Sequence, residues 1–189
     1  NPNAKSRPRV FCSDGRNSTY WSEYQFTDIF TENGQHTLYA WMPSYMERYN
    51  AYYTESVESQ AWTLHEEHNT ILGHDCQRAT CHWRGRDFEA WFAADIPVHL
   101  GPWIFGGLPG LIVKVYDTDH LYTFECTNVE RVNRPMLRSK YERRKPIKRE
   151  TVLKFERKIN ENPSKTLGWK DLNGNPMSQV FPYEALELE

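Results

Sequence analysis

Apolar and polar residues alternate along most of the first two thirds of the chain. Successive side chains of a β-strand point to opposite faces, so this period of two predicts strands. Short clusters of glycine, proline, asparagine and aspartate separate the alternating segments, as is typical of turns. The predicted strands cover residues 20–30, 36–42, 76–83, 87–93, 111–116 and 121–129, with a further alternating segment at 56–70.

The segment 87–93 shows the alternation most clearly. Phe88, Ala90 and Phe92 share one face of this strand, whereas Glu89 and Trp91 share the other. One face of the predicted sheet is therefore apolar and suited to a core, and the opposite face is mixed.

Two segments depart from the period of two. Ser44 is a residue type that caps helices, and it favours a short helix through Tyr53. From Thr151 to Ile159 the apolar residues recur at helical spacing, and Asn162-Pro163 ends this second helix. The whole pattern predicts a mainly β protein, in which a strongly curved, half-barrel-like antiparallel sheet carries one or two packed helices.

Length and composition favour one domain. The chain has 189 residues, and no shift in composition marks a boundary within it. We therefore expect a single domain over residues 1–189, with an extended lead-in at 1–18, a sheet core at 20–129, and a basic connection, helix and tail at 133–189. No stretch approaches the roughly 20 apolar residues that span a bilayer, so we expect no transmembrane segment.

The charge balance argues against nucleic acid as a partner. The 23 basic and 25 acidic residues nearly cancel, so no overall field attracts polyanions. A local basic stretch within 134–149 is the exception. It is either a solvated connection between sheet and helix or a patch for phosphate-rich surfaces such as lipid head groups. Its cationic residues are Arg134, Arg138, Lys140, Arg143, Arg144, Lys145, Lys148 and Arg149.

The cysteine count is even. Four cysteines are compatible with two disulfides in an oxidising compartment, and buried thiols are the alternative. Cys76 and Cys81 fall at opposite parity in one predicted strand and point to opposite faces, which disfavours a bond between them. We expect Cys76 to pair with Cys126 or with Cys12.

Histidines gather near two of these cysteines. Imidazole and thiolate ligands together suit copper or zinc, so the cluster is a candidate metal site. The alternative is a set of exposed polar residues on one face of the sheet. His65, His74 and His82 are the first candidates for metal ligands. The full cluster comprises His65, His68, His74, Cys76, Cys81 and His82.

The sequence offers no positive sign of an enzyme. It lacks the Gly-x-Ser-x-Gly elbow of serine hydrolases. The glycines at 106–110 lack the Lys and Ser/Thr of a phosphate-binding loop. Aspartates and glutamates are scattered over strand ends and turns, where aspartate is common for conformational reasons. We therefore assign no catalytic residue, and no cofactor beyond the copper or zinc alternative.

Aromatic residues are dense in the first third of the chain. They either line a ligand groove or form the core of a curved sheet. These residues are Trp21, Tyr24, Trp41, Tyr45, Tyr49, Tyr52, Tyr53 and Trp62.

A glycine-dense segment precedes the strand predicted at 111–116. Pro109-Gly110 suits the middle of a type II turn, because proline fixes φ and glycine accepts a positive φ. The segment is either a structural turn or a loop that faces a ligand or partner. Its residues are Phe105, Gly106, Gly107, Leu108, Pro109, Gly110, Leu111 and Ile112.

Residues 107–112 read GLPGLI, and this part of the chain resembles the GLPGLI family of exported Bacteroidota proteins. Ile71 to Ala79 is similar to the family pattern I-x-G-Y-x-C-Q-K-A, with His74 where tyrosine is usual. The resemblance runs from about Trp62 to Val129. Further matching segments follow in the family's order: Arg84-Gly85-Arg86, Ala90-Trp91-Phe92, Ile96-Pro97, Gly101-Pro102 and Phe105-Gly106, with looser similarity at Thr151–Ile159 and Glu184–Glu189.

The resemblance implies export to the periplasm or the outer membrane, and it implies no particular activity. Genes of the family often lie beside those of TonB-dependent outer-membrane receptors, so such a receptor or another envelope protein is the expected partner. We expect an exported, non-catalytic binding or accessory protein. The alternatives are a periplasmic protein that binds copper or zinc and, third, a hydrolase.

Overall fold

The computed structural model describes residues 11–13, 18–20, 25–41, 49–133, 144–178, 180 and 183–188. The chain divides into two compact units. The described residues of the first come from Glu58–Met136 and Ala185–Glu189, and those of the second come from Lys5–Val57 and Leu137–Glu184. We call them the five-stranded unit and the four-stranded unit, after their main sheets.

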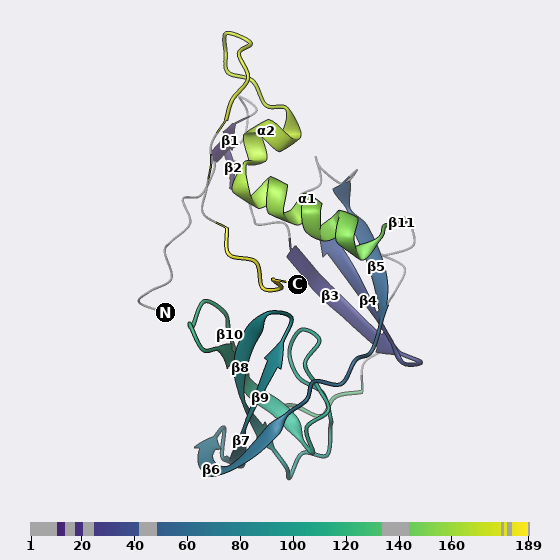
Figure 1. The fold of residues 1–189 in the computed structure, drawn as a ribbon, viewed down its shortest axis with the longest axis vertical. Coiled ribbons are helices and arrows are strands. Elements are labelled where there is room, and N and C mark those ends of the chain that lie inside the picture. The colour runs from purple at the N-terminus through teal and green to yellow at the C-terminus, as the bar shows by residue number, and fades with distance from the viewer. Residues whose placement is uncertain are drawn as a thin grey trace. The chain divides into compact units, whose positions relative to one another are not determined.

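The five-stranded unit contains an antiparallel sheet in the order β10-β9-β8-β7-β6 (Figure 1). A two-residue turn joins β7 to β8. Both of its residues, Arg84 and Gly85, have positive φ, as a type I′ hairpin turn requires. The strands are β6 (Thr63–Ile71), β7 (His74–Trp83), β8 (Arg86–Ala93), β9 (Leu111–Asp117) and β10 (Thr123–Glu125).

The alternation predicted for 87–93 is confirmed. Phe88, Ala90 and Phe92 are buried on one face of β8, whereas Glu89 and Trp91 are half-buried on the other. The apolar face forms the main core of this unit. The core cluster consists of Ala79, Cys81, Phe88, Ala90, Phe92, Phe105, Leu108, Ile112 and Val115.

The four-stranded unit contains a sheet in the order β11-β5-β4-β3. Its β3–β4 and β4–β5 pairs are antiparallel, and its β11–β5 pair is parallel. The strands are β3 (Gln25–Glu32), β4 (Gln35–Trp41), β5 (Ala51–Ser56) and β11 (Lys145–Pro146), and a separate pair is formed by β1 (Phe11–Ser13) and β2 (Ser18–Tyr20).

The described residues of the four-stranded unit also form two helices, α1 (Arg149–Glu161) and α2 (Pro163–Leu167). Val152 and Ile159 of α1 are buried, in agreement with the helical spacing of its apolar residues. Asn162 follows α1 and caps α2, because its Oδ1 accepts a hydrogen bond from the backbone N–H of Lys165 at 3.0 Å. Among the described residues, no helix is both long and apolar enough to cross a membrane.

The predicted fold class is confirmed: the described part of the chain is mostly β with two helices, and its sheets are open, not closed into a barrel. The helix predicted from Ser44 to Tyr53 is wrong from Ala51 onward, where the chain forms β5, whereas Tyr49 lies in a 3₁₀ turn. Ala51 and Tyr53 are buried residues of β5, with the exposed or half-buried residues of the strand between and after them. Tertiary packing of this alternation outweighs the capping signal of Ser44. The strand predicted at 121–129 is reduced to β10.

Candidate functional site

The three histidines proposed as metal ligands do not meet. His74 and His82 lie at opposite ends of β7. Eight residues of extended chain at roughly 3.3 Å each separate them by about 26 Å. His65 lies on β6, where its Nε2 is 2.8 Å from the hydroxyl of Thr80. These three side chains therefore cannot hold one ion together.

Each histidine at a strand end has a carboxylate neighbour instead. His74 Nδ1 lies 2.7 Å from Asp95 Oδ2, and His82 Nδ1 lies 2.7 Å from Asp87 Oδ1. A third pair joins His68 to Asp75 at 3.0 Å. Within the described ranges, no three or more histidine, cysteine, aspartate or glutamate side chains are grouped as a metal site.

The cysteines that the structure describes in full are free thiols. Cys76 lies in β7, and the backbone N–H of Cys126 bonds to Val113 of β9 at 2.8 Å. Strands β8 and β9 thus lie between the two cysteines, so at about 4.8 Å per strand their Cα atoms are roughly 14 Å apart. A disulfide needs less than about 7 Å, and the predicted Cys76–Cys126 bond is therefore wrong. The side chain of Cys12 lies outside the described residues.

Burial makes two of these thiols poor nucleophiles. It raises the pKa of Cys81 to about 12, and it also raises the pKa of Cys76. The thiolate is the reactive form, so both residues behave as apolar core residues at neutral pH.

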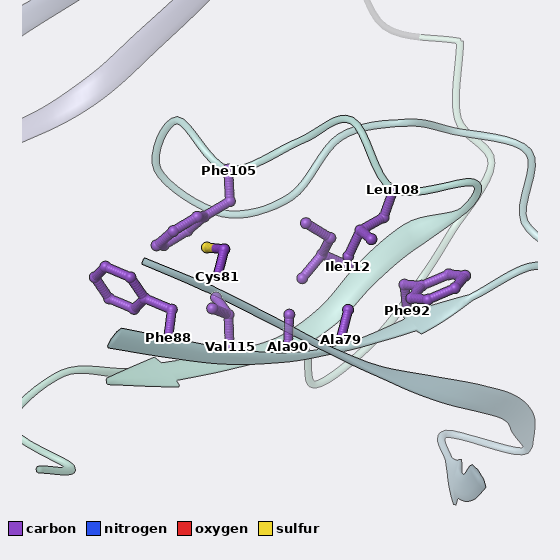
Figure 2. Packing of buried hydrophobic residues seen from close by; sticks show 9 residues of the cluster. All are labelled: Ala79, Cys81, Phe88, Ala90, Phe92, Phe105, Leu108, Ile112 and Val115. Carbon is purple, nitrogen blue, oxygen red and sulfur yellow. The ribbon is translucent and has the colours of Figure 1, made fainter. Parts of the chain in front are cut away.

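Residues 105–110 form a loop over the apolar face of the five-stranded sheet, and Leu111 and Ile112 begin its strand β9. Figure 2 shows Phe105 and Leu108 pointing from the loop toward the sheet, where Phe88 and Phe92 point toward the loop. Phe105 is 2% exposed and Leu108 is 1% exposed. The rings of Phe105 and Phe88 pack edge to face with centroids 4.8 Å apart. The loop therefore forms the second layer of the core.

Polar side chains hold the backbone of this loop in place. Gln60 is 4% exposed; its Oε1 accepts from the N–H of Gly106 at 3.1 Å, and its Nε2 donates to the carbonyl of Ile104 at 3.3 Å. Trp62 Nε1 donates to the carbonyl of Gly106 at 2.8 Å. The buried backbone groups of the loop thus have specific partners, as a buried loop requires.

Two glycines of the motif are explained by space and backbone angle. A Cβ on Gly110 would lie 2.1 Å from the carbonyl oxygen of Ala93, which leaves no room for any other residue. Gly107 has φ +82°, a conformation that favours glycine. Of the proposed loop residues, Gly107 and Pro109 are exposed, Gly106 and Leu111 are half-buried, and Phe105, Leu108, Gly110 and Ile112 are buried.

The opposite face of the same sheet carries a network of charged and aromatic side chains. Glu89 is its centre. Its Oε2 accepts from Arg78 Nε at 2.8 Å, and its Oε1 accepts from Trp91 Nε1 at 3.2 Å and from the hydroxyl of Tyr116. Arg78 also reaches Glu67 Oε1 at 3.2 Å. We call this surface the Glu89 face, defined as Glu67, Arg78, Glu89, Trp91, Lys114 and Tyr116.

The network fixes the charge state of its members. Burial alone would raise the pKa of Glu89, but hydrogen bonds from Tyr116, Arg78 and Trp91, together with the charge of Arg78, lower it overall. Burial raises the pKa of Tyr116, and its hydrogen bond to Glu89 raises it further. At neutral pH the face therefore presents an ionised carboxylate and a protonated phenol.

Sequence reasoning placed Glu89 and Trp91 on one face but did not identify the network. The missing information is the register between strands. Trp91 lies opposite Arg78 and Lys114, and Glu89 lies opposite Tyr116. The alternation within β8 is the one signal in the sequence that marks this face.

The basic stretch is only partly described. Four of its residues lie outside the described residues: Arg134, Arg138, Lys140 and Arg143. Arg149 is described, and it pairs with Glu55 at 3.4 Å.

The aromatic residues of the first third are also only partly described. Trp21, Tyr24 and Tyr45 lie outside the described residues, as does the side chain of Trp41. Those described are packed: Tyr53 is 2% exposed, Tyr49 stacks on Phe155 with centroids 5.5 Å apart, Tyr52 contacts Tyr39, and Trp62 packs on the core cluster.

Part of this chain is similar to a family of unknown function. A family model described as a protein of unknown function, Porph_ging, matches residues 48–114, a range that includes β6, β7, β8 and the loop. No curated protein matches the chain.

Two solved structures of PNGF-II, in the C2 and P21 space groups, are similar to this chain. Their TM-scores are 0.52 and 0.53, each at 19% sequence identity and over 68% of this chain. The matched part is 24% and 23% of the PNGF-II chains, so this chain spans about a quarter of their length. At this identity the similarity concerns the fold alone.

Proposed function

We propose that this chain is an exported protein of the GLPGLI type that acts as a non-catalytic binding protein of the cell envelope. Its partner is a TonB-dependent outer-membrane receptor or another envelope protein, and its contact surface is the Glu89 face. The ordered similarity from about Trp62 to Val129 supports the family, and the matched residues 48–114 overlap it.

The proposal rests on the residue types of the Glu89 face and on the hydrogen bonds that hold their side chains in place. Arginine, tryptophan and tyrosine are the residue types that contribute most at protein interfaces. Here one of each is held by a shared hydrogen-bonded carboxylate, Glu89. The side chains of Arg78 and Lys114 remain 27% and 31% exposed. A partner therefore meets side chains that are already ordered, which lowers the entropy cost of binding.

The same geometry argues against proton-transfer chemistry at this face. A general acid or base works best when its pKa lies near the working pH. The pKa of Glu89 is lowered, and both of its oxygens already accept hydrogen bonds from Arg78, Trp91 and Tyr116. Glu89 is therefore suited to positioning its neighbours.

The relation to PNGF-II supports a modular role. There a similar fold accounts for about a quarter of a longer chain. A fold does not by itself imply a function, so this similarity supports only that such a fold can be one part of a longer chain.

Site-specific photo-crosslinking tests the proposal. A photoreactive amino acid is placed at Lys114 on the Glu89 face, and a matched one is placed at the exposed Pro109 of the loop. Each protein is mixed with outer-membrane extract from a Bacteroidota species that encodes a family member, and crosslinked proteins are identified by mass spectrometry. The dissociation constant of the purified pair is then measured for wild type, Trp91→Ala and Pro109→Ala.

We expect an envelope protein to be crosslinked from position 114 and not from position 109. Trp91→Ala should weaken binding by about 30-fold, as expected for a residue that contributes about 2 kcal/mol. Pro109→Ala should bind like wild type. Crosslinking from position 109 with no effect of Trp91→Ala would move the contact to the loop and reject the Glu89 face.

A further inference from the structure

Residues Ala185–Leu188 lie against the β7–β8 turn as a bound peptide. Arg86 Nε lies 3.1 Å from the carbonyl oxygens of both Ala185 and Leu186, and Arg86 Nη2 donates to Ala185 as well. These bonds involve backbone carbonyls of the segment, which bends at Leu186, so they require no particular side chain.

Side chains of the segment add selectivity. Glu187 Oε1 lies 2.8 Å from Arg84 Nη1, and the two side chains are 6% and 12% exposed. The backbone N–H of Leu188 donates to the carbonyl of Arg84 at 3.0 Å. Leu186 packs against the core cluster of the five-stranded unit. The contacts thus select leucine followed by an acidic residue.

The receiving side is held in place from within the five-stranded unit. Arg86 is 6% exposed, and its Nη1 lies 3.4 Å from Oδ2 of Asp117, which is 1% exposed. Asp117 Oδ1 accepts from the N–H of Tyr122 at 2.7 Å, and the Tyr122 ring lies 5.5 Å from the Arg86 guanidinium. A buried guanidinium has five N–H donors, so Asp117 leaves several of them for the peptide carbonyls.

The segment is remote in the chain from the strands that bind it. The five-stranded unit includes Glu58–Met136, and Leu137–Glu184 belong to the other unit before the chain returns at Ala185. Non-covalent contacts, including those described above, attach it to the β7–β8 turn. Such a segment can leave the site and be replaced by another peptide of the same chemistry.

We propose that Arg84, Arg86 and Asp117 form a peptide-binding site for an acidic segment of the pattern Ala-Leu-Glu-Leu, and that residues 185–188 fill it within the folded chain. The site is independent of the Glu89 face, because it uses the β7–β8 turn and different side chains. A peptide with leucine followed by glutamate competes with residues 185–188 for this site.

The test uses a variant of the full chain in which Leu186→Ser and Glu187→Lys weaken the binding of residues 185–188 to the site. A fluorescent peptide with the sequence of residues 183–188 is added, and its anisotropy is followed. We expect saturable binding to this variant and at least tenfold weaker binding to wild type, whose own segment competes at an effective concentration of about 1 mM. A peptide with Glu187→Lys should bind at least tenfold more weakly than the parent peptide. The matched control, a peptide with Leu188→Ala, should bind within about twofold of the parent, because the Leu188 side chain is 50% exposed and the variant keeps the backbone N–H that donates to Arg84.

A folded variant that shows no saturable binding overturns the proposal, as does equal binding of the Glu187→Lys peptide. If the variant does not fold, hydrogen exchange of wild type decides. Millimolar unlabelled peptide should speed exchange of the Leu188 amide, whose acceptor on Arg84 the peptide then occupies. Unchanged protection at Leu188 rejects the site.

Discussion

The two faces of the five-stranded sheet share the same strands and differ in what lies over them. On one face, Ala90 and Phe92 are fully buried beneath a loop that includes the first four residues of GLPGLI. On the other, Glu89 and Trp91 join a polar network that is partly open to solvent. Residues one position apart on β8 therefore serve a core and a surface.

The difference shows that the most recognisable motif in the sequence, GLPGLI, does not coincide with the network of charged and aromatic side chains. The GLPGLI loop is distinctive because close packing allows few alternatives at Gly110 and Leu108. The Glu89 face has no distinctive string, because its residues come from several strands. Changes on the loop should therefore cost stability, and changes on the Glu89 face should cost mainly binding.

The largest effect is expected for Gly110→Ala. The new Cβ would lie 2.1 Å from the backbone of Ala93, and a backbone atom cannot move aside as a flexible side chain can. We expect a loss of about 4 kcal/mol or failure to fold, measured by urea denaturation. Gly73→Ala is the control, since Gly73 has φ +83° and no atom within 4 Å of the added Cβ. Backbone strain alone should cost it about 1–2 kcal/mol. Equal losses for the two variants would show that the loop does not need this close approach.

Next in size is the difference in thiol reactivity between core and surface. The pKa of Cys81 rises from 9.0 to about 12, which reduces its thiolate roughly a thousandfold. In a Cys12→Ser background, iodoacetamide at pH 8 should label the half-buried Cys126 and leave Cys81 at least a thousandfold slower, as read by peptide mass mapping. Labelling in urea should remove the difference. Protection of both Cys76 and Cys126 until a reductant is added would instead indicate a disulfide.

Leu108→Ala should cost less than Gly110→Ala, at about 3 kcal/mol. The change removes a side chain that is 1% exposed and leaves a cavity in the core cluster, near Ile112 and Phe92 (Figure 2). Thermal and urea unfolding measure the loss. Pro109→Ala, at an exposed neighbour in the same loop, should change stability by no more than about 0.5 kcal/mol. A destabilisation of similar size at both positions would argue against Leu108 as a core residue.

The smallest effect is expected for Glu89→Gln, at about 1 kcal/mol near pH 7, because its side chain is still 17% exposed. The folded-state pKa of Glu89 lies below its ordinary value of 4.5. Its charge therefore stabilises the fold fully above pH 4.5, and this contribution is lost as the pH falls through the lowered pKa. In the variant, this part of the acid-induced decrease in the free energy of unfolding should be absent. Urea unfolding at pH values between 2 and 7 measures the decrease. Glu66→Gln, at an exposed residue of β6, controls for loss of one charge. The same decline in wild type and Glu89→Gln would exclude Glu89 as its source.

Local patterns predicted most of the elements of this fold. Alternation located β7, β8 and β9, and the spacing of Val152 and Ile159 located α1. The helix predicted through Tyr53 failed because a single capping residue is a weak signal beside the alternating burial of β5. The second helix, α2, was missed because Asn162-Pro163 both ends α1 and begins α2.

For the candidate sites, the sequence predicted only which residues share a face within one strand. Parity correctly separated Cys76 from Cys81 and paired Glu89 with Trp91. It gives no order of strands in the sheet, and that order places β8 and β9 between Cys76 and Cys126. Nor does it give contacts across long separations, so the bond from Arg86 to Ala185 had no signal in the sequence.

The return of the chain at Ala185 also sets an order of events during synthesis. Arg86 and Asp117 emerge from the ribosome well before the segment that completes their hydrogen bonds. At about 5–20 residues per second, translation takes several seconds to cover the intervening chain. During that interval the guanidinium has a carboxylate neighbour but lacks the carbonyls of residues 185 and 186. The five-stranded unit thus reaches its final form only after residues 185–188 have emerged, and a nascent chain stalled before Ala185 offers this arginine to a chaperone or to another peptide.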